Sequence, residues 1–328
     1  MDRRTVLHRG FALATGAILG CNLDAYAENT YPNRTIKIIV PYSAGTGSDA
    51  MARTIAQSIG EKTGQTIIVE NKEGGGSLIG TMALVNAQPD GYTILIAANP
   101  LVILPSQYNK PPYDPTRDII PISKFGSIPL VLAVSPSLGL NNMKELVAYA
   151  KTNPGKLSYG SSGSGTISQQ EMELFKQVLG LDIPEIPYKS TAQAMTDLLG
   201  GILPILPVVI PLVDQHLQSG RAKALAIFDN RRSPLLPNIP AITEEVNISG
   251  YTPTPVWYGF VAPAKTPKDI IQTLNGYIQT ALTTPEVKNR MTNLGAQPIN
   301  VSNEQFMIDL KNEYEKAGQL SKKLGVFK

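Results

Sequence analysis

The sequence is poor in the side chains on which disulfides, metal sites and many catalytic centres depend. Its 328 residues include one cysteine, two histidines and one tryptophan. One cysteine cannot form an intramolecular disulfide or a cysteine-based metal site. Two histidines cannot form the three-histidine ligand sets of catalytic zinc enzymes. We therefore expect no metal centre in this chain.

Charge of one sign and long apolar runs are also scarce. Twenty-nine basic and 26 acidic residues are scattered along the chain and give a net charge of +3. No basic block favours a nucleic-acid partner. The apolar run ILPILPVVIP (202–211) is too short and too rich in proline for a membrane helix. The apolar fraction of 42% is typical of a globular protein, and the length favours two domains.

The N-terminal segment has the features of an export signal. Arg3 and Arg4 precede an apolar stretch from Phe11 to Cys21, and Ala25-Tyr26-Ala27 fits a cleavage site. The stretch of about 11 residues is well short of the roughly 20 that span a bilayer. We predict a signal peptide over 1–27 and a periplasmic location. Sec and twin-arginine export both stay open, and lipid attachment at Cys21 is a minority alternative.

Cleavage after Ala27 has a consequence for catalysis. It removes Cys21 and His8 and leaves His216 as the sole histidine. His216 lies in the polar stretch DQHLQSG, far in sequence from the glycine-rich turns described below, and is interpreted as a surface residue. No serine occurs in a G-x-S-x-G elbow, and no P-loop is present. We expect no catalytic residue and no cofactor.

Strand-like and helix-like segments alternate after Tyr31. Segments 34–40, 65–70 and 90–99 are β-rich, whereas 48–64 and 73–88 have apolar residues at helical spacing after small or glycine-rich turns. Segments 156–160, 183–190 and 222–228 are strand-like again, with helices at 167–180 and 191–201. This alternation predicts parallel sheets covered by helices on both faces.

The same plan occurs twice, which indicates two domains. A strand, a glycine-rich turn and a helix occupy 36–62 and again 157–180, and a strand, a proline turn and an amphipathic helix occupy 130–151 and 258–279. The second pair suits the points where the chain passes between domains. We predict one lobe from 28–129 plus 250–328 and the other from 130–249.

The two glycine-rich turns predict an anion site. Turns 43–48 and 161–166 follow strands and precede helices, where ligands bind in open α/β sheets and where helix N-termini attract anions. Any single hydroxyl there is more often a helix N-cap or a turn former, and the two turns together favour ligand contact. The residues expected to contact the ligand, with hydroxyls donating to it, are Ser43, Ala44, Gly45, Thr46, Gly47, Ser48, Asp49, Ser77, Asn99, Ser161, Ser162, Ser164, Thr166 and Tyr188.

Asp49 is ambiguous, because its carboxylate suits the helix dipole but repels an anion unless it faces away or meets an amine.

A dinucleotide site is a weaker alternative. Gly45-x-Gly47-x-x-Ala50 follows a strand and precedes a helix, and Glu70 lies 20 residues beyond Ala50. Four residues (41–44) separate the strand from the first glycine, where that turn is normally tight, and export removes the chain from cytoplasmic nicotinamide cofactors. An oxidoreductase is therefore a second hypothesis.

Several long motifs resemble a known family of receptors. They are YPNRTIKIIVPYSAGTGSDAMAR, ENKEGGGSLIGTMALVNAQPDGYTIL, YDPTRDIIPIS, NPGKLSYGSSGSGTISQQEMELFK, IPYKSTAQAMTDLLGG, LPNIPAITE and WYGFVAPAKTPKDIIQTLN. In this order they resemble the Bug-type extracytoplasmic receptors of tripartite tricarboxylate transporters, from about Tyr31 to the C-terminus. The sequence departs from the family pattern at Thr46, at Gln169-Gln170 and at Leu203-Pro204.

The resemblance implies a type II periplasmic binding protein, an α/β Venus flytrap with a ligand cleft between two parallel-sheet lobes. It implies a small carboxylate ligand held by turns 43–49 and 161–166, with Ser77, Tyr188 and Thr191 also lining the cleft. The implied partners are membrane permease subunits, and we expect a monomer. An exported receptor that serves a signalling partner is an alternative.

Overall fold

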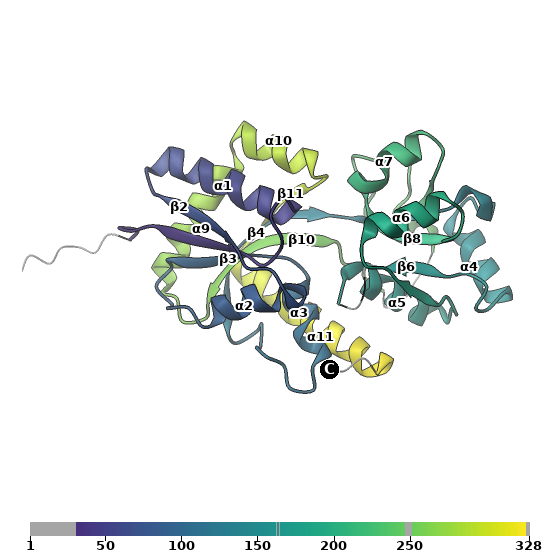
Figure 1. Cartoon of the computed structure of the whole chain (residues 1–328), viewed down its shortest axis with the longest axis horizontal. Helices are drawn as coiled ribbons and strands as arrows, with labels where there is room; N and C mark the ends of the chain where they lie inside the picture. Colours follow the sequence, from purple (N-terminus) through teal and green to yellow (C-terminus); the bar gives the residue numbers. More distant parts are fainter. Residues whose placement is uncertain (1–30, 162, 164, 247–250, 326–328) are drawn as a thin grey trace, which may run out of the picture.

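The computed structural model of the chain describes residues 31–161, 163, 165–246 and 251–325. It contains two β-sheets that lie side by side, each with helices on both faces (Figure 1). We call each sheet with its covering helices a lobe, the six-stranded lobe and the five-stranded lobe. The predicted signal peptide and lipid-attachment cysteine lie outside the described residues. No helix in the described part of the chain combines the length and the apolar character needed to cross a bilayer.

The six-stranded sheet has the order β11-β4-β10-β3-β1-β2. Strands β2 and β3 both run parallel to β1, whereas β10 runs antiparallel to β3 and β4, and β11 antiparallel to β4. The strands are β1 (Ile36–Val40), β2 (Ile67–Asn71), β3 (Thr93–Ala97), β4 (Ile119–Ile128), β10 (Val256–Pro263) and β11 (Gln297–Val301).

The five-stranded sheet has the order β7-β6-β8-β5-β9. Strand β6 is parallel to β7 and β8, whereas β5 is antiparallel to β8 and β9. Its strands are β5 (Leu130–Val134), β6 (Tyr159–Ser161), β7 (Glu185–Pro187), β8 (Ile205–Val209) and β9 (Lys223–Phe228). Both sheets are thus mixed, and the expectation of parallel sheets is met only by β1 to β3 and β6 to β8. The two-lobe α/β fold itself is as predicted.

Apolar residues on both sides of each strand explain the double layer of helices. In β5, Leu130, Leu132 and Val134 join one core, and Val131 and Ala133 join another. Period-2 alternation places these two sets on opposite faces of the sheet. A strand buried on both faces therefore reads as an unbroken apolar run.

Helices cover all four faces. On the six-stranded sheet, one face packs against α1 (Gly47–Thr63), α9 (Lys268–Leu282) and α10 (Pro285–Asn293), the other against α2 (Leu78–Val85), α3 (Pro100–Ile103) and α11 (Asn303–Leu324). On the five-stranded sheet, one face packs against α4 (Met143–Thr152), α5 (Ile167–Leu179) and α8 (Ile242–Glu245), the other against α6 (Thr191–Leu199) and α7 (Ile210–Gln218). Short 3-10 turns are η1 (Gly75–Ser77), η2 (Pro105–Gln107) and η3 (Pro136–Leu138).

Strand β8 lies in the proline-rich apolar run that the sequence excluded as a membrane helix but did not identify as a strand. Pro207 stands in a strand between two others, where a missing N–H is normally excluded. The ladder to β6 consists of one pair, Tyr159 with Ile205, so it has already ended where Pro207 stands. The ladder to β5 continues through Pro207 opposite Leu132.

The chain passes from the six-stranded to the five-stranded lobe between β4 and β5, and it returns between α8 and β10. One continuous apolar core includes Leu101 and Phe306 from the first lobe and Leu132 and Phe175 from the second. The predicted residue limits of the two lobes stay a prediction.

Candidate functional site

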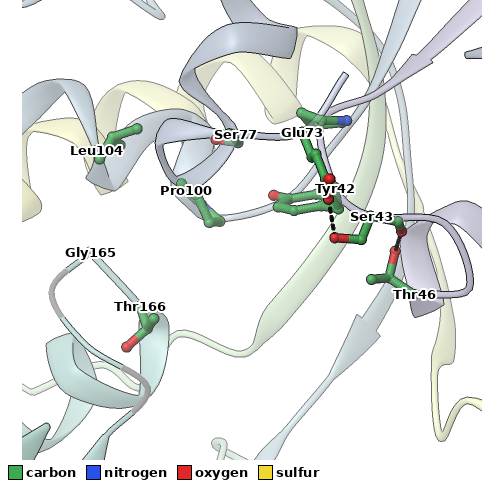
Figure 2. Close-up of a pocket in the computed structure, with 12 residues that line it drawn as sticks. Tyr42, Ser43, Thr46, Glu73, Ser77, Pro100, Leu104, Gly165 and Thr166 are labelled. Atoms are coloured by element: carbon green, nitrogen blue, oxygen red, sulfur yellow. Dashed lines mark hydrogen bonds between the residues drawn. The ribbon is translucent and has the colours of Figure 1, made fainter. Parts of the chain in front are cut away.

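A cavity of about 720 Å³ lies where turns of the two lobes face each other. Figure 2 shows Ser43, Thr46 and Glu73 on one side of it and Gly165 and Thr166 across the gap. Its volume lies in the range of small-molecule pockets. The lining residues are Pro41, Tyr42, Ser43, Thr46, Glu73, Gly74, Gly76, Ser77, Pro100, Leu104, Gly165 and Thr166.

These residues come from loops that follow the carboxyl ends of β1, β2, β3 and β6. Parallel strands bring such loops to one edge of a sheet. Gly80 of α2 packs against the loops that follow β1 and β2. A Cβ at this position would lie 2.8 Å from Pro41 Cα and 2.9 Å from the Lys72 carbonyl oxygen. Only glycine fits between these two backbone segments.

Helix α1 begins in the first turn with a reciprocal cap. Thr46 Oγ1 accepts a hydrogen bond from Asp49 N at 3.4 Å, and Asp49 Oδ2 accepts one from Gly45 N at 2.9 Å. The Asp49 carboxylate also binds Arg53 at 3.0 Å and Asn71 Nδ2 at 2.9 Å. Burial would raise the pKa of Asp49, but these bonds outweigh it and lower the pKa. Asp49 therefore meets a guanidinium group and does not line the cavity.

The loop before α2 supplies a strained residue. Ser77 has φ of +97°, in the left-handed region that non-glycine residues seldom adopt. The residue is 3% exposed, and its hydroxyl makes no hydrogen bond of good geometry. The hydroxyl of Tyr42 is its electrostatic neighbour: burial raises the pKa of Tyr42, and Ser77 lowers it to a smaller extent. Strain and an unsatisfied hydroxyl in one cavity-lining residue favour a ligand contact.

The five-stranded lobe contributes the start of α5, with Thr166 as its N-cap. Gly165 has φ of +84°, and its N–H donates to Gln169 Oε1 at 3.1 Å. The amide of Gln169 continues to Glu185 Oε2 at 2.9 Å, and Glu185 also accepts from the Ser161 hydroxyl. This chain of bonds fixes the turn that faces the other lobe.

The hydroxyl hydrogens of this cavity are largely committed within the protein. Ser43 donates to Glu73, Thr46 Oγ1 donates to the Ser43 oxygen at 2.9 Å, and Thr166 Oγ1 donates to the Gly163 oxygen at 2.8 Å. A hydroxyl group has one donor and two acceptor positions. In this structure the three hydroxyls therefore face the cavity with acceptor positions, and their donation to a ligand stays a prediction.

Comparison with known proteins identifies the family. Residues 51–326 match the family described as "Tripartite tricarboxylate transporter family receptor". The chain belongs to this family.

Relatives and solved structures of this receptor family agree with the assignment. The protein BugT of Bordetella pertussis is 34% identical over 292 residues, which are 88% of each chain. The periplasmic binding protein BugD is 34% identical, with a TM-score of 0.73 over 90% of this chain and 99% of its own. A protein of R. palustris, solved with adipate, is 28% identical, with a TM-score of 0.74 over 89% of this chain and 98% of its own. The receptor family consists of periplasmic solute-binding proteins.

The structure brings four of the residues predicted for this receptor to the cavity, namely Ser43, Thr46, Ser77 and Thr166. Turns 43–48 and 161–166 thus share one cavity, as their positions in the sequence predict. Ser162 and Ser164 lie outside the described residues. Ligand contact stays a prediction for all of these residues. Those that do not line the cavity are Ala44, Gly45, Gly47, Ser48, Asp49, Asn99, Ser161, Tyr188 and Thr191.

Several of these residues have partners inside the fold. Asn99 Nδ2 donates to Glu313 Oε1 at 2.8 Å, and the Tyr188 hydroxyl donates to Asp197 Oδ2 at 2.8 Å. Gly47 packs against Tyr258, whose hydroxyl would lie 3.1 Å from an added Cβ. Glu70, the acidic residue of the dinucleotide hypothesis, is paired with Lys37 at 2.9 Å and with Lys72 at 2.7 Å.

Sequence reasoning missed Tyr42, Glu73, Pro100 and Leu104. Tyr42 and Glu73 could have been predicted, because both lie in loops already assigned to the ligand site. Tyr42 follows β1, and Glu73 precedes the glycine run 74–76. Pro100 begins the short helix α3 and Leu104 caps its C-terminal end, and no sequence pattern distinguished them from core residues.

Proposed function

We propose that this chain is an exported receptor that captures a small organic carboxylate and delivers it to a tripartite tricarboxylate-type membrane transporter. The observation that carries the proposal is the cavity into which turns of both lobes project. The family assignment supports it, and so does the adipate of a structural relative. Export by a signal peptide cleaved after Ala27, a monomeric state and lobes of 28–129 with 250–328 and of 130–249 complete the proposal.

The cavity suits an anion through its backbone. None of the described residues that line it is basic. A carboxylate there is held by unpaired N–H groups at the starts of α1 and α5, and by the positive ends of these helix dipoles. Ser77 adds an uncommitted hydroxyl on the same wall.

The mechanism is closure of the lobes around the ligand. A ligand that contacts Thr46 on one lobe and Thr166 on the other stabilises the arrangement in which both touch it. Only this difference in affinity between the open and closed forms shifts the population. The closed form then presents both lobes in a fixed relation to the membrane partner.

Isothermal titration with a panel of carboxylates tests the proposal. Wild-type protein should bind at least one member, and Thr166→Phe, which fills the cavity, should weaken that binding at least about tenfold. Thr152→Phe is the matched control, because Thr152 is exposed at the end of α4 and does not line the cavity. Equal affinities of the two variants would contradict the site, and a panel without any binder would contradict the function.

A further inference from the structure

The cavity holds one acidic side chain that the function proposed above does not use. Glu73 is exposed, lines the cavity and accepts a hydrogen bond from the Ser43 hydroxyl. Figure 2 shows its carboxylate beside Ser43, on the wall opposite Thr166. A carboxylate in a pocket that binds carboxylates calls for a physical explanation.

Glu73 is not accounted for by an ion pair within the protein. The ion pairs found among the described residues do not include it. Its neighbour in sequence, Lys72, is directed to Glu70 at 2.7 Å, and Lys37 binds the other oxygen of the same group at 2.9 Å. Lys37 and Lys72 are thus committed to Glu70, and Glu73 faces the cavity with no ion-pair partner in the described part of the chain.

The hydroxyls beside Glu73 add to its acceptor character. Ser43 gives its hydrogen to Glu73, and Thr46 gives its hydrogen to the Ser43 carbonyl oxygen. Both hydroxyl oxygens retain lone pairs, so this wall offers acceptors. Donors lie on other parts of the cavity: the Ser77 hydroxyl, the Tyr42 hydroxyl and the start of α5 at Thr166. A ligand that satisfies both sets needs an acceptor group and a donor group.

A dicarboxylate satisfies only one of these sets. Its second carboxylate would share a cavity of about 720 Å³ with Glu73, without a basic residue among the described lining residues to separate the charges. Two negative charges that share a cavity of this size repel each other. An ammonium group in the same place is attracted by Glu73 and donates hydrogen bonds to Glu73 and Ser43.

We propose that Glu73 is a specificity-determining residue that selects zwitterionic ligands, in which an amino group accompanies the carboxylate. The inference rests on the proposed function, because it assumes that a carboxylate occupies this cavity. The start of α5 and Ser77 hold the carboxylate of the ligand, and Glu73 with Ser43 holds its ammonium group.

Matched acids of equal chain length test the inference by calorimetry at neutral pH. The pairs are succinate with 4-aminobutanoate, glutarate with 5-aminopentanoate and adipate with 6-aminohexanoate, so that each pair exchanges a carboxylate for an aminomethyl group. Wild-type protein should prefer the amino acid of the best-binding pair by at least about tenfold. Glu73→Gln should weaken the amino acid and strengthen the dicarboxylate, whereas damage to the fold would weaken both.

Glu61→Gln is the control for net charge, because Glu61 is exposed on α1 and does not line the cavity. It should leave the preference of the wild type unchanged. Tighter binding of dicarboxylates by wild-type protein would overturn the zwitterion inference and leave the carboxylate receptor standing. An unchanged preference in Glu73→Gln would also overturn it. Binding of neither series would overturn the proposed function together with the inference.

Discussion

Glu313 of α11 makes the stability of the folded protein depend on pH. The residue is 7% exposed, and each of its carboxyl oxygens accepts one hydrogen bond, from Asn99 Nδ2 at 2.8 Å and from Trp257 Nε1 at 2.7 Å. Burial raises the pKa of Glu313 from 4.5 to about 7, although the two donors and the charge of Lys124 lower it. The buried carboxyl of Glu171 raises it further.

The raised pKa fixes the direction of the effect. Between pH 4.5 and about 7, the folded protein holds a proton on Glu313 that the unfolded chain releases. The contribution to the free energy of unfolding is therefore complete below pH 4.5, falls as the pH rises, and is lost above about pH 7. The pKa difference corresponds to a total of about 3 kcal/mol.

Urea denaturation from pH 4.5 to 8, followed by circular dichroism, measures this contribution. Glu313→Gln exchanges one acceptor oxygen for a donor and should lower the free energy of unfolding by about 1–3 kcal/mol at pH 4.5. Because glutamine does not titrate, the free energy of unfolding of the variant relative to wild type should rise by about 3 kcal/mol on going to pH 8. Glu315→Gln, an exposed change on the same helix, should follow the wild-type profile. Parallel profiles of wild type and Glu313→Gln would refute the assignment.

Two further substitutions test the loops around the cavity. Gly80→Ala places a methyl group within 2.9 Å of Pro41 and Lys72 backbone atoms, so it should lower both the melting temperature and the ligand affinity. The control Gly276→Ala, with open space around it, should stabilise the protein by up to about 1 kcal/mol. Equal melting temperatures of these two variants would contradict the packing argument. Asp49→Ala removes the acceptor for three donors and should lower the free energy of unfolding by about 1–3 kcal/mol, measured by urea denaturation at pH 7. A decrease below about 0.5 kcal/mol, the limit for neutral surface changes, would show that these bonds contribute little.

Local sequence signals account for the elements that build the site. Thr46 and Gly64 mark the ends of α1, and Gly180 marks the end of α5. Because loops after parallel strands meet at one edge, turns assigned from sequence alone converge on one cavity. The proline-rich strand β8 escaped this reasoning, since its place between β6 and β5 depends on a ladder that ends at Ile205.

Other features depend on partners that are remote in sequence. Asn99 stands at the end of β3, as a ligand residue would, but its side chain binds Glu313, which lies 214 residues later. The hydrogens of Ser43 and Thr166 are committed to an acidic side chain and a turn carbonyl. No pattern in the sequence distinguishes a hydroxyl that donates to a ligand from one that donates to its own loop.

The contacts of segment 251–254 connect the returning chain crossing to both lobes. The Tyr251 hydroxyl donates to Glu171 Oε2 of α5 at 2.8 Å, which ties this residue to the five-stranded lobe. Lys316 Nζ of α11 donates to the Thr252 oxygen at 2.7 Å and to Thr254 Oγ1 at 3.1 Å, which ties the next residues to the six-stranded lobe. Thr254 and Lys316 also interact with the buried Glu171 carboxyl, whose pKa burial raises and these groups lower. The segment is thus held from both lobes along its length, and a relative rotation of the lobes would have to be spread over its backbone torsions.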